Sequence, residues 1–147
     1  MPPSRRRPGP APVSPLDAAL QRVGDRWTLL VVEALLAGPQ RFGELEERID
    51  GLAPNILSKR LKALEADGVI VAAPYSQRPY RVAYALSASG LELAGALRLL
   101  AQWGGERSPG GAGVRHDTCG TAVEARWWCP TCARTVDDDE APDLDFV

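Results

Sequence analysis

Four side chains that commonly bind a transition metal lie close together near the end of this 147-residue chain. The chain has three cysteines and one histidine, and all of them fall in one stretch: His116, Cys119, Cys129 and Cys132. They form two pairs, His-x2-Cys and Cys-x2-Cys. Three thiolates and one imidazole make a closed tetrahedral zinc site, and two such pairs supply the four ligands. This spacing predicts a structural Zn²⁺ ion in a small zinc-ribbon-like unit over residues 114–136.

Other interpretations of these cysteines remain open. A redox pair at Cys129 and Cys132 would lack the βαβ context of a thioredoxin-like site, and a disulfide is disfavoured in the cytoplasm. A degenerate pattern without metal competes more strongly, because histidine is the less common first ligand at this spacing. If the unit forms, residues 121–128 are expected to make its hairpin, with Trp127 and Trp128 covering the metal.

A second group of residues has the chemistry of a surface that binds a polyanion. Residues 54–63 contain three cations and no acid. Leu57, Leu61 and Leu64 recur at the spacing that places side chains on one face of a helix. The opposite face then carries polar side chains that can bind bases or phosphates: Asn55, Ser58, Lys59 and Lys62. This helix is a candidate for DNA recognition, although an ordinary solvated helix face has a similar composition.

The segments before this helix predict the elements that hold it. Residues 17–23 form a short helical pattern, and residues 26–37 are apolar nearly all round, which is typical of a buried central helix. Asp25 is a good N-cap for that central helix. A helix over 41–49 and a short turn lead to the basic helix over 54–66. A short helix, a tight turn and a basic helix make a helix-turn-helix.

A β-hairpin pattern follows directly. Residues 69–71 and 81–86 favour strands, and the segment between them is rich in Pro, Ser, Gln and Arg. Arg78 and Arg81 fall at or near the tip of this hairpin. A hairpin with basic tip residues after a helix-turn-helix is a wing, which we place at residues 75–81.

The last helical pattern, residues 88–103, carries more apolar side chains than one narrow face requires. Ser87 is suited to cap it. The excess favours burial against a second copy of the chain, with the N-terminal helix contributing, and so predicts a homodimer. Packing of the same side chains onto their own domain is the alternative.

These elements predict a mainly α fold with a small β-hairpin wing, a winged helix-turn-helix, followed by a small zinc-ribbon-like β unit. Residues 1–110 hold 14 Arg and Lys against 11 Asp and Glu, a net +3, whereas residues 111–147 hold 3 against 8, a net −5. A weakly basic domain permits DNA binding through a local patch without requiring it. The predicted divisions are a disordered basic arm at 1–13, the DNA-binding and dimerisation domain at 14–104, a Gly-rich linker at 105–113, the zinc-ribbon-like unit at 114–136 and an acidic disordered tail at 137–147.

Several functional classes lack support in the sequence. The N-terminal arginines have no apolar stretch behind them, and the longest apolar run, residues 27–37, is too short to cross a bilayer and contains Glu33. A cytoplasmic protein that does not enter a membrane is therefore expected. The single histidine and the lack of a glycine-rich phosphate loop or a Ser-His-Asp set argue against an enzyme.

Residues 16–104 resemble the HxlR family of bacterial winged helix-turn-helix regulators, a relative of the MarR group. The segments that carry the resemblance are Gly24-Asp25-Arg26-Trp27-Thr28-Leu29-Leu30, Arg41-Phe42-Gly43-Glu44-Leu45, Leu57-Ser58-Lys59-Arg60-Leu61-Lys62-Ala63-Leu64-Glu65, Asp67-Gly68-Val69-Ile70 and Tyr84-Ala85-Leu86-Ser87. The resemblance implies a homodimer on double-stranded DNA, with two recognition helices in successive major grooves and the wings on the flanking backbone. The resemblance also implies that four residues of the recognition helix face the DNA: Asn55, Ser58, Lys59 and Lys62. It places Arg60 at the side of the helix, where this residue would contact a phosphate or brace the fold.

One position departs from the family pattern. Members often begin the domain with Cys-Pro, in which the cysteine is in several cases a redox-sensing thiol, whereas this chain has Ser14-Pro15. Serine has no thiolate to oxidise, so redox sensing by that route is excluded. An effector, such as a small molecule not yet identified, would have to act elsewhere.

The expected function is therefore that of a sequence-specific, DNA-binding transcriptional regulator. We expect a homodimeric repressor that binds DNA with helix 54–66 in the major groove and wing 75–81 on the backbone. Two alternatives come from the C-terminal unit. A winged helix beside a zinc ribbon also occurs in basal transcription factors that bind RNA polymerase, and oxidation of the three thiols would make the unit a redox switch.

Overall fold

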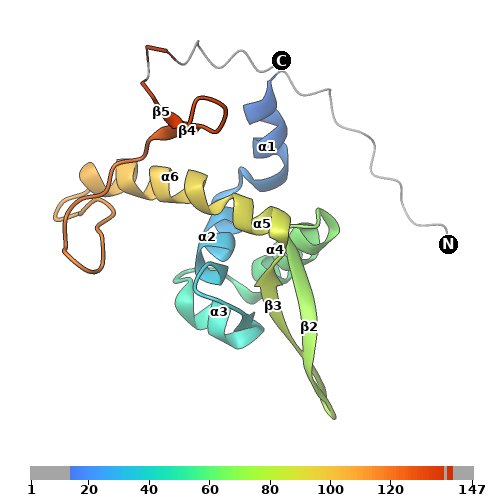
Figure 1. Ribbon diagram of the computed structural model, residues 1–147. Coiled ribbons are helices and arrows are strands. Elements are labelled where there is room, and N and C mark those ends of the chain that lie inside the picture. The colour runs from blue at the N-terminus through green and yellow to red at the C-terminus, as the bar shows by residue number, and fades with distance from the viewer. Residues whose placement is uncertain (1–13, 138, 141–147) are drawn as a thin grey trace.

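The computed structural model describes residues 14–137, 139 and 140, and the predicted basic arm and most of the acidic tail lie outside these residues. Its elements are α1 (Pro15–Val23), α2 (Arg26–Leu35), β1 (Gln40–Arg41), α3 (Phe42–Arg48), α4 (Pro54–Ala66), β2 (Ile70–Gln77), β3 (Tyr80–Leu86), α5 (Ala88–Glu92), α6 (Ala94–Glu106), β4 (Trp127–Cys129) and β5 (Arg134–Val136). Figure 1 shows β2 and β3 projecting from the helices as a long ribbon. The predicted mainly α fold with a β-hairpin wing is confirmed. None of the described helices has the length and apolar composition needed to cross a bilayer.

Local sequence determines where the first two helices begin. The Ser14 hydroxyl accepts a hydrogen bond from the backbone N–H of Asp17 at 3.1 Å and so caps α1. The Asp25 carboxylate caps α2 in the same way, because it accepts from the N–H groups of Trp27 at 3.1 Å and Thr28 at 3.2 Å. Asp25 therefore has the capping role predicted for it.

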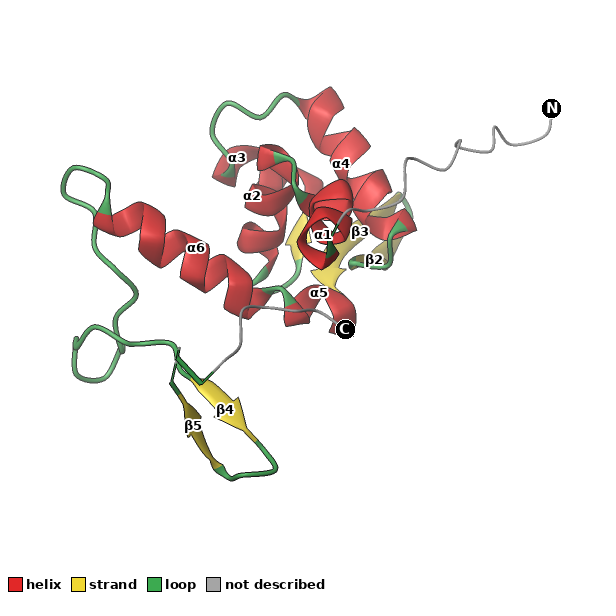
Figure 2. Ribbon diagram, turned by 90° about the horizontal axis from the view of Figure 1, so that it is seen from above, coloured by secondary structure: helices red, strands yellow, loops and turns green. Residues whose placement is uncertain are grey.

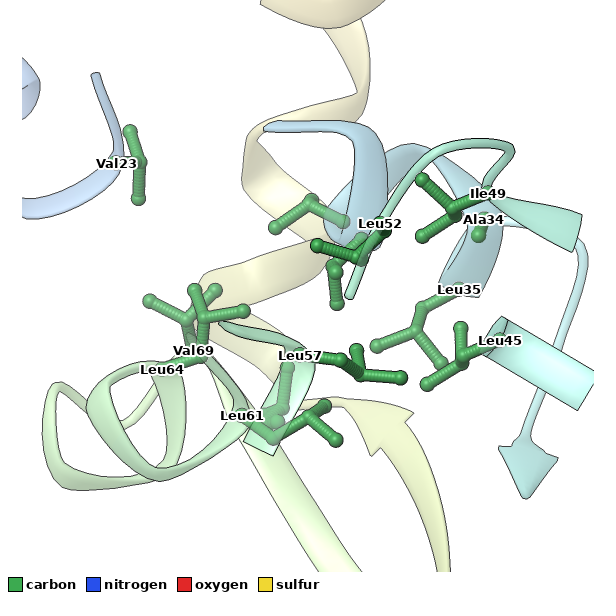
Figure 3. Packing of buried hydrophobic residues seen from close by; sticks show 13 residues of the cluster. Val23, Ala34, Leu35, Leu45, Ile49, Leu52, Leu57, Leu61, Leu64 and Val69 are labelled. Carbon is green, nitrogen blue, oxygen red and sulfur yellow. The ribbon is translucent and has the colours of Figure 1, made fainter. Parts of the chain in front are cut away.

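Side chains from α2, α3 and α4 form most of the hydrophobic core. Figure 3 shows Leu35, Leu45 and Leu57, one from each helix, pointing toward one another. The leucines of α4, which are Leu57, Leu61 and Leu64, are all buried, as their helical spacing predicts. Each such side chain contributes about 1.5–3 kcal/mol on burial, so these leucines hold one face of α4 firmly on the domain. The polar face of α4 is thereby turned outward.

The helix-turn-helix consists of α3, a turn at residues 49–53 and α4. Ile49 and Leu52 are buried and anchor the turn to the core (Figure 3). Gly51 lies between them with φ = +77°, a conformation that other residues adopt only rarely. Helix α4 has the predicted bounds, residues 54–66.

The wing is longer than predicted. Strands β2 and β3 pair antiparallel from Ile70 opposite Leu86 to Gln77 opposite Tyr80, and β1 pairs with the other side of β3. The segment expected to be a loop is therefore mostly strand. Proline cannot donate a hydrogen bond to a neighbouring strand, so Pro74 favours a loop when only the sequence is considered. Because β2 is the edge strand of this sheet, it tolerates Pro74.

The predicted helix at 88–103 is two helices, α5 and α6, with a break at Leu93. Ser87 caps α5 as predicted, because its Oγ accepts from the N–H of Gly90 at 3.1 Å. The same hydroxyl lies 2.6 Å from the carbonyl oxygen of Gly68 and 3.0 Å from that of Val69, to which it can donate. Gly90 approaches the backbone so closely that an added Cβ would lie 2.1 Å from the Val69 oxygen. These contacts attach α5 to the start of the wing.

The C-terminal unit pairs residues other than those predicted. In the β4–β5 hairpin, Trp127 lies opposite Val136 and Cys129 lies opposite Arg134. The hairpin therefore spans residues 127–136 rather than 121–128, because the Cys-x2-Cys segment itself forms the turn. Figure 2 shows this hairpin beyond α6, on the side away from α2, α3 and α4.

Candidate nucleic-acid interface

The outward face of α4 carries the polar residues predicted for DNA recognition. Asn55, Lys59 and Lys62 are exposed, and Ser58 is half-buried. Residues three or four apart on a helix are surface neighbours, so these side chains form one ridge opposite the buried leucines. An amide, a hydroxyl and two ammonium groups on one ridge can hydrogen-bond to base edges and phosphate oxygens. The fold thus brings these four residues together.

Arg60 was expected either to contact a phosphate or to brace the fold, and in the structure it braces the fold. Its Nε lies 3.0 Å from Oδ1 of Asp25, as an ion pair without hydrogen-bond geometry. Because Asp25 also caps α2, the pair joins α4 to the start of α2. About a third of each side chain remains exposed, so the pair contributes at most about 1 kcal/mol to folding.

The wing places two further cations on an element separate from α4. Arg78 and Arg81 are exposed at the end of the hairpin, beside the exposed ring of Tyr80. Figure 1 shows that the β2–β3 ribbon extends well away from the helical body. A ribbon of this reach with a cationic tip can lie along a nucleic-acid backbone that flanks the surface under α4.

One contact between β1 and the wing was not predicted. The Arg41 guanidinium lies 4.3 Å from the centroid of the Tyr75 ring, a distance typical of a cation–π interaction. Arg41 lies in β1, pairs with Ala83 of β3 and immediately precedes α3, so this contact joins the helix-turn-helix to the wing. A two-residue strand leaves no periodic pattern in a sequence, which is why neither β1 nor the contact was foreseen.

The four predicted metal ligands form two separate pairs. Nδ1 of His116 lies 3.3 Å from Sγ of Cys119, and the backbone N–H of Cys132 donates to Sγ of Cys129 at 3.5 Å. Among the residues that the structure describes, no three or more His, Cys, Asp or Glu side chains gather as a metal site. Each pair can act as a bidentate ligand, but the set of four predicted from the sequence is not assembled.

Hydrogen bonds favour the thiolate form at two of these cysteines. The side chain and backbone of Thr121, followed by the side chain of His116, lower the pKa of Cys119 to about 7. Hydrogen bonds from the backbone and side chain of Cys132 and the backbone of Thr131 lower the pKa of Cys129. The thiolate is the form of cysteine that binds metals and attacks electrophiles, so both turns favour reactive sulfur.

Helix α6 and helix α1 expose apolar side chains. Leu93 and Leu97 pack against the core and account for one side of the last helical segment. The large apolar residues that stay exposed on α1 and α6 are Leu16, Leu20, Leu99, Leu100 and Trp103. The Trp103 side chain is 61% exposed. Packing of these side chains onto their own domain was the alternative to a dimer. The structure shows that such packing leaves these five side chains exposed.

A cavity of about 500 Å³ separates α6 from the C-terminal unit. Its lining is predominantly apolar and includes Ala96, Leu99, Val114, Val123, Ala125 and Trp127. Arg98 and Glu124 are among its charged lining residues. The cavity thus lies between α6 and the segment that leads into β4.

Comparison with known proteins agrees with this geometry. A family model described as HxlR-like helix-turn-helix matches residues 22–110. The chain belongs to this family. The resemblance inferred from the sequence is thus confirmed. The HxlR-like domain runs from the end of α1 through α6 and includes the helix-turn-helix and the wing. Members of this class are transcriptional regulators with a DNA-binding domain, so the protein is a transcriptional regulator of the helix-turn-helix type.

Individual relatives extend the match. Rv3095 of Mycobacterium tuberculosis, named as an uncharacterized HTH-type transcriptional regulator, is 38% identical over 122 residues, which cover 80% of this chain and 77% of Rv3095. The crystal structure of PA1607, a candidate transcription factor, is 28% identical with a TM-score of 0.71 and covers 90% of this chain and 95% of PA1607. The redox regulator HypR in its reduced form is 28% identical with a TM-score of 0.61, over 64% of this chain and 93% of HypR. The likeness to PA1607 thus reaches beyond residues 22–110.

Proposed function

We propose that this HxlR-like protein is a sequence-specific repressor that binds double-stranded DNA as a homodimer. In this proposal α4 enters the major groove and the wing follows the flanking backbone. The orientation of α4 supports it best: Leu57 and Leu61 are buried, while Asn55, Lys59 and Lys62 are exposed. A helix held in this way can enter a groove about 12 Å wide without disturbing the core.

The residues of α4 and the wing divide between base recognition and phosphate binding. Asn55 lies in the first turn of α4, and recognition helices contact base edges mainly through their N-terminal residues. Its amide can pair bidentately with adenine. Lys59, Lys62 and the wing residues Arg78 and Arg81 are suited to phosphate oxygens, because ammonium and guanidinium groups bind the backbone of any sequence.

Homodimerisation would place two copies of this surface on one duplex. The exposed side chains of α1 and α6 supply an apolar surface that a second copy would bury. A two-fold axis along this surface would present two α4 helices to major grooves about one helical turn, or roughly 34 Å, apart. The operator would then be an inverted repeat.

Repression follows from this mode of binding. A dimer that occupies two successive major grooves and the backbone beside them covers a promoter segment that RNA polymerase also needs. Such occlusion requires no activating contact with the polymerase. Repression is therefore the simplest regulatory outcome of the proposed complex.

Redox control is not part of this proposal. HypR is a redox regulator by name, but in this chain Ser14 replaces the N-terminal cysteine and caps α1. All three cysteines follow residue 110, the end of the HxlR-like match. The family match therefore supports DNA binding without supporting a thiol sensor within the matched domain.

Selection of binding sites from a pool of random duplexes by the full chain tests the proposal. We expect enrichment of an inverted repeat with half-sites about 10 base pairs apart, centre to centre. Retardation of that duplex should be weakened by Lys59→Ala and left unchanged by Arg107→Ala, which removes an exposed cation from the end of α6, away from α4 and the wing. A pool without any enriched sequence would contradict the proposal.

A further inference from the structure

The two ligand pairs of the C-terminal unit have the same backbone design. In the first pair, His116 begins a turn, Cys119 follows three residues later, and Gly120 has φ = +70°. The N–H of His116 donates to the carbonyl of Thr121 at 2.9 Å, and the N–H of Gly120 donates to the carbonyl of His116 at 2.7 Å. The turn thus brings ligand positions i and i+3 to the same side, with their donor atoms 3.3 Å apart.

The second pair repeats this design position by position. Cys129 ends β4, Cys132 follows three residues later, Ala133 has φ = +53°, and Arg134 begins the return strand opposite Cys129. Among the residues that the structure describes, Ala133 is the one non-glycine residue with positive φ. Strained backbone of this kind is concentrated at functional sites such as ligand clamps. The N–H of Cys132 also points at the sulfur of Cys129.

The unit formed by these turns lacks a hydrophobic core. None of the residues from 114 to 136 is buried, and the side chains of Trp127 and Trp128 are 60% and 61% exposed. All three cysteines are free thiols, so no disulfide stabilises the unit. A segment of this size needs a metal ion, a disulfide or a partner to hold a fixed fold.

We propose that both turns bind one Zn²⁺ ion through His116, Cys119, Cys129 and Cys132, and that this ion holds the C-terminal unit together. A set of three thiolates and one imidazole suits tetrahedral zinc better than magnesium or calcium, which take oxygen ligands. The two pairs are separate in the structure, so ion binding requires the segment between them to bring the turns together. Residues 124–126 belong to no helix or strand and can adjust in this way.

The charges around the turns are compatible with this ion. Zn²⁺ with three thiolates and a neutral imidazole carries a net charge of −1. Arg115, Arg126 and Arg134 flank the ligands and are exposed. Arg126 and Arg134 already pair with Glu124 and Glu140. Arg115, which donates to the carbonyl of Gly120 at 2.8 Å, is therefore the cation best placed to offset the charge of the ion and its ligands. Cationic side chains beside thiolate ligands lower the electrostatic cost of gathering them.

Metal analysis of the full chain, purified without a histidine tag from zinc-supplemented cells, tests this proposal. We expect about one zinc per chain, the content of a single four-ligand site. Cys119→Ser and Cys132→Ser should each lose the zinc, whereas Thr131→Ala, which lies between two ligands, should retain it. A zinc content near zero in the wild-type chain would overturn the proposal.

Cobalt substitution separates one shared site from two independent pairs. Co²⁺ bound by the wild-type chain should give a sulfur-to-cobalt charge-transfer band with the intensity expected for three thiolate ligands. His116→Cys should retain the metal and raise that band by about one third, because it supplies a fourth thiolate. If the double variant His116→Ala, Cys119→Ser binds Co²⁺ as tightly as the wild type, the Cys129–Cys132 pair acts alone and the shared site is wrong.

The zinc site and the proposed DNA function can fail independently. Removal of zinc with a chelator should expose residues 107–140 to proteolysis and leave the HxlR-like domain protected. Loss of DNA binding by a fully zinc-loaded chain would contradict the regulator proposal alone. Unchanged protease resistance of the C-terminal unit after complete zinc removal would contradict the structural role of the ion alone.

Discussion

The polar residues on the outward face of α4 differ in the kind of DNA contact that they can make. Lys59 and Lys62 are exposed point charges suited to phosphate oxygens. Each lysine-to-alanine change should weaken binding to all duplexes alike and reduce the slope of log affinity against log salt by about one per contact, and so by about two for a homodimer. Retardation of the selected duplex over a salt series measures this slope. An unchanged slope in both variants would show that these lysines do not contact phosphate groups of the DNA.

The ion pair between Arg60 and Asp25 gives a second prediction at this scale. Arg60→Ala should cost at most about 1 kcal/mol in the free energy of unfolding, because the pair is partly exposed. Asp25→Asn should cost a similar amount, since asparagine still caps α2. Asp25→Ala should cost about 0.5–2 kcal/mol more through loss of the cap. Urea unfolding of the three variants provides the comparison, and equal losses for Asn and Ala at position 25 would contradict the capping role.

Individual side chains were predictable from the sequence where their environment is local. The helical spacing of Leu57, Leu61 and Leu64 was sufficient to predict which face of α4 is buried, and Asp25 was predicted as a cap from its position alone. The stacking of Arg41 on Tyr75 was not predictable, because it joins segments that are distant in the sequence and meet only in the folded sheet. The role of Arg60 needed the position of α2 beside α4.

At the scale of elements, the junction between the wing and α5 depends on a glycine. An added Cβ at Gly90 would lie 2.1 Å from the Val69 oxygen, and that atom belongs to the backbone and cannot move aside easily. Gly90→Ala should therefore destabilise the domain by about 1–3 kcal/mol. Gly95→Ala, in the first turn of α6 where an added Cβ would meet no atom within 4 Å, should instead stabilise the domain by about 0.5–1 kcal/mol. Thermal or urea unfolding tests the opposite signs, and equal effects of the two changes would contradict the tight junction.

Element boundaries were predictable where turn chemistry or capping marks them. Helix α4 starts with Pro54 and ends before Asp67 and Gly68, and its bounds agree with the prediction. The wing was underestimated because Pro74 is tolerated only on an edge strand, and strand order is not visible in a sequence. The break at Leu93 was not predictable, because Leu93, Leu97 and Leu100 keep helical spacing and Leu93 itself has helical dihedral angles, φ −72° and ψ −14°.

For the whole molecule, the exposed apolar residues on α1 and α6 predict the state of association. Trp103→Glu should convert a dimer to a monomer, because a carboxylate would be buried without a partner. Sedimentation velocity measures this change. Val71→Glu, which adds the same charge at an exposed apolar position on β2, should leave the dimer intact. A monomeric wild-type chain at micromolar concentration would contradict the dimer.

The proposed complex depends most on α4 lying in the major groove with Asn55 at a base edge. The most direct test repeats the selection from random duplexes with Asn55→Ala. Binding to the best wild-type duplex should fall by about 1–3 kcal/mol, and preference should be lost at one base pair in each half-site while the other positions keep theirs. If Asn55→Ala selects the same sequence with the same preference at every position, α4 does not read DNA in this way.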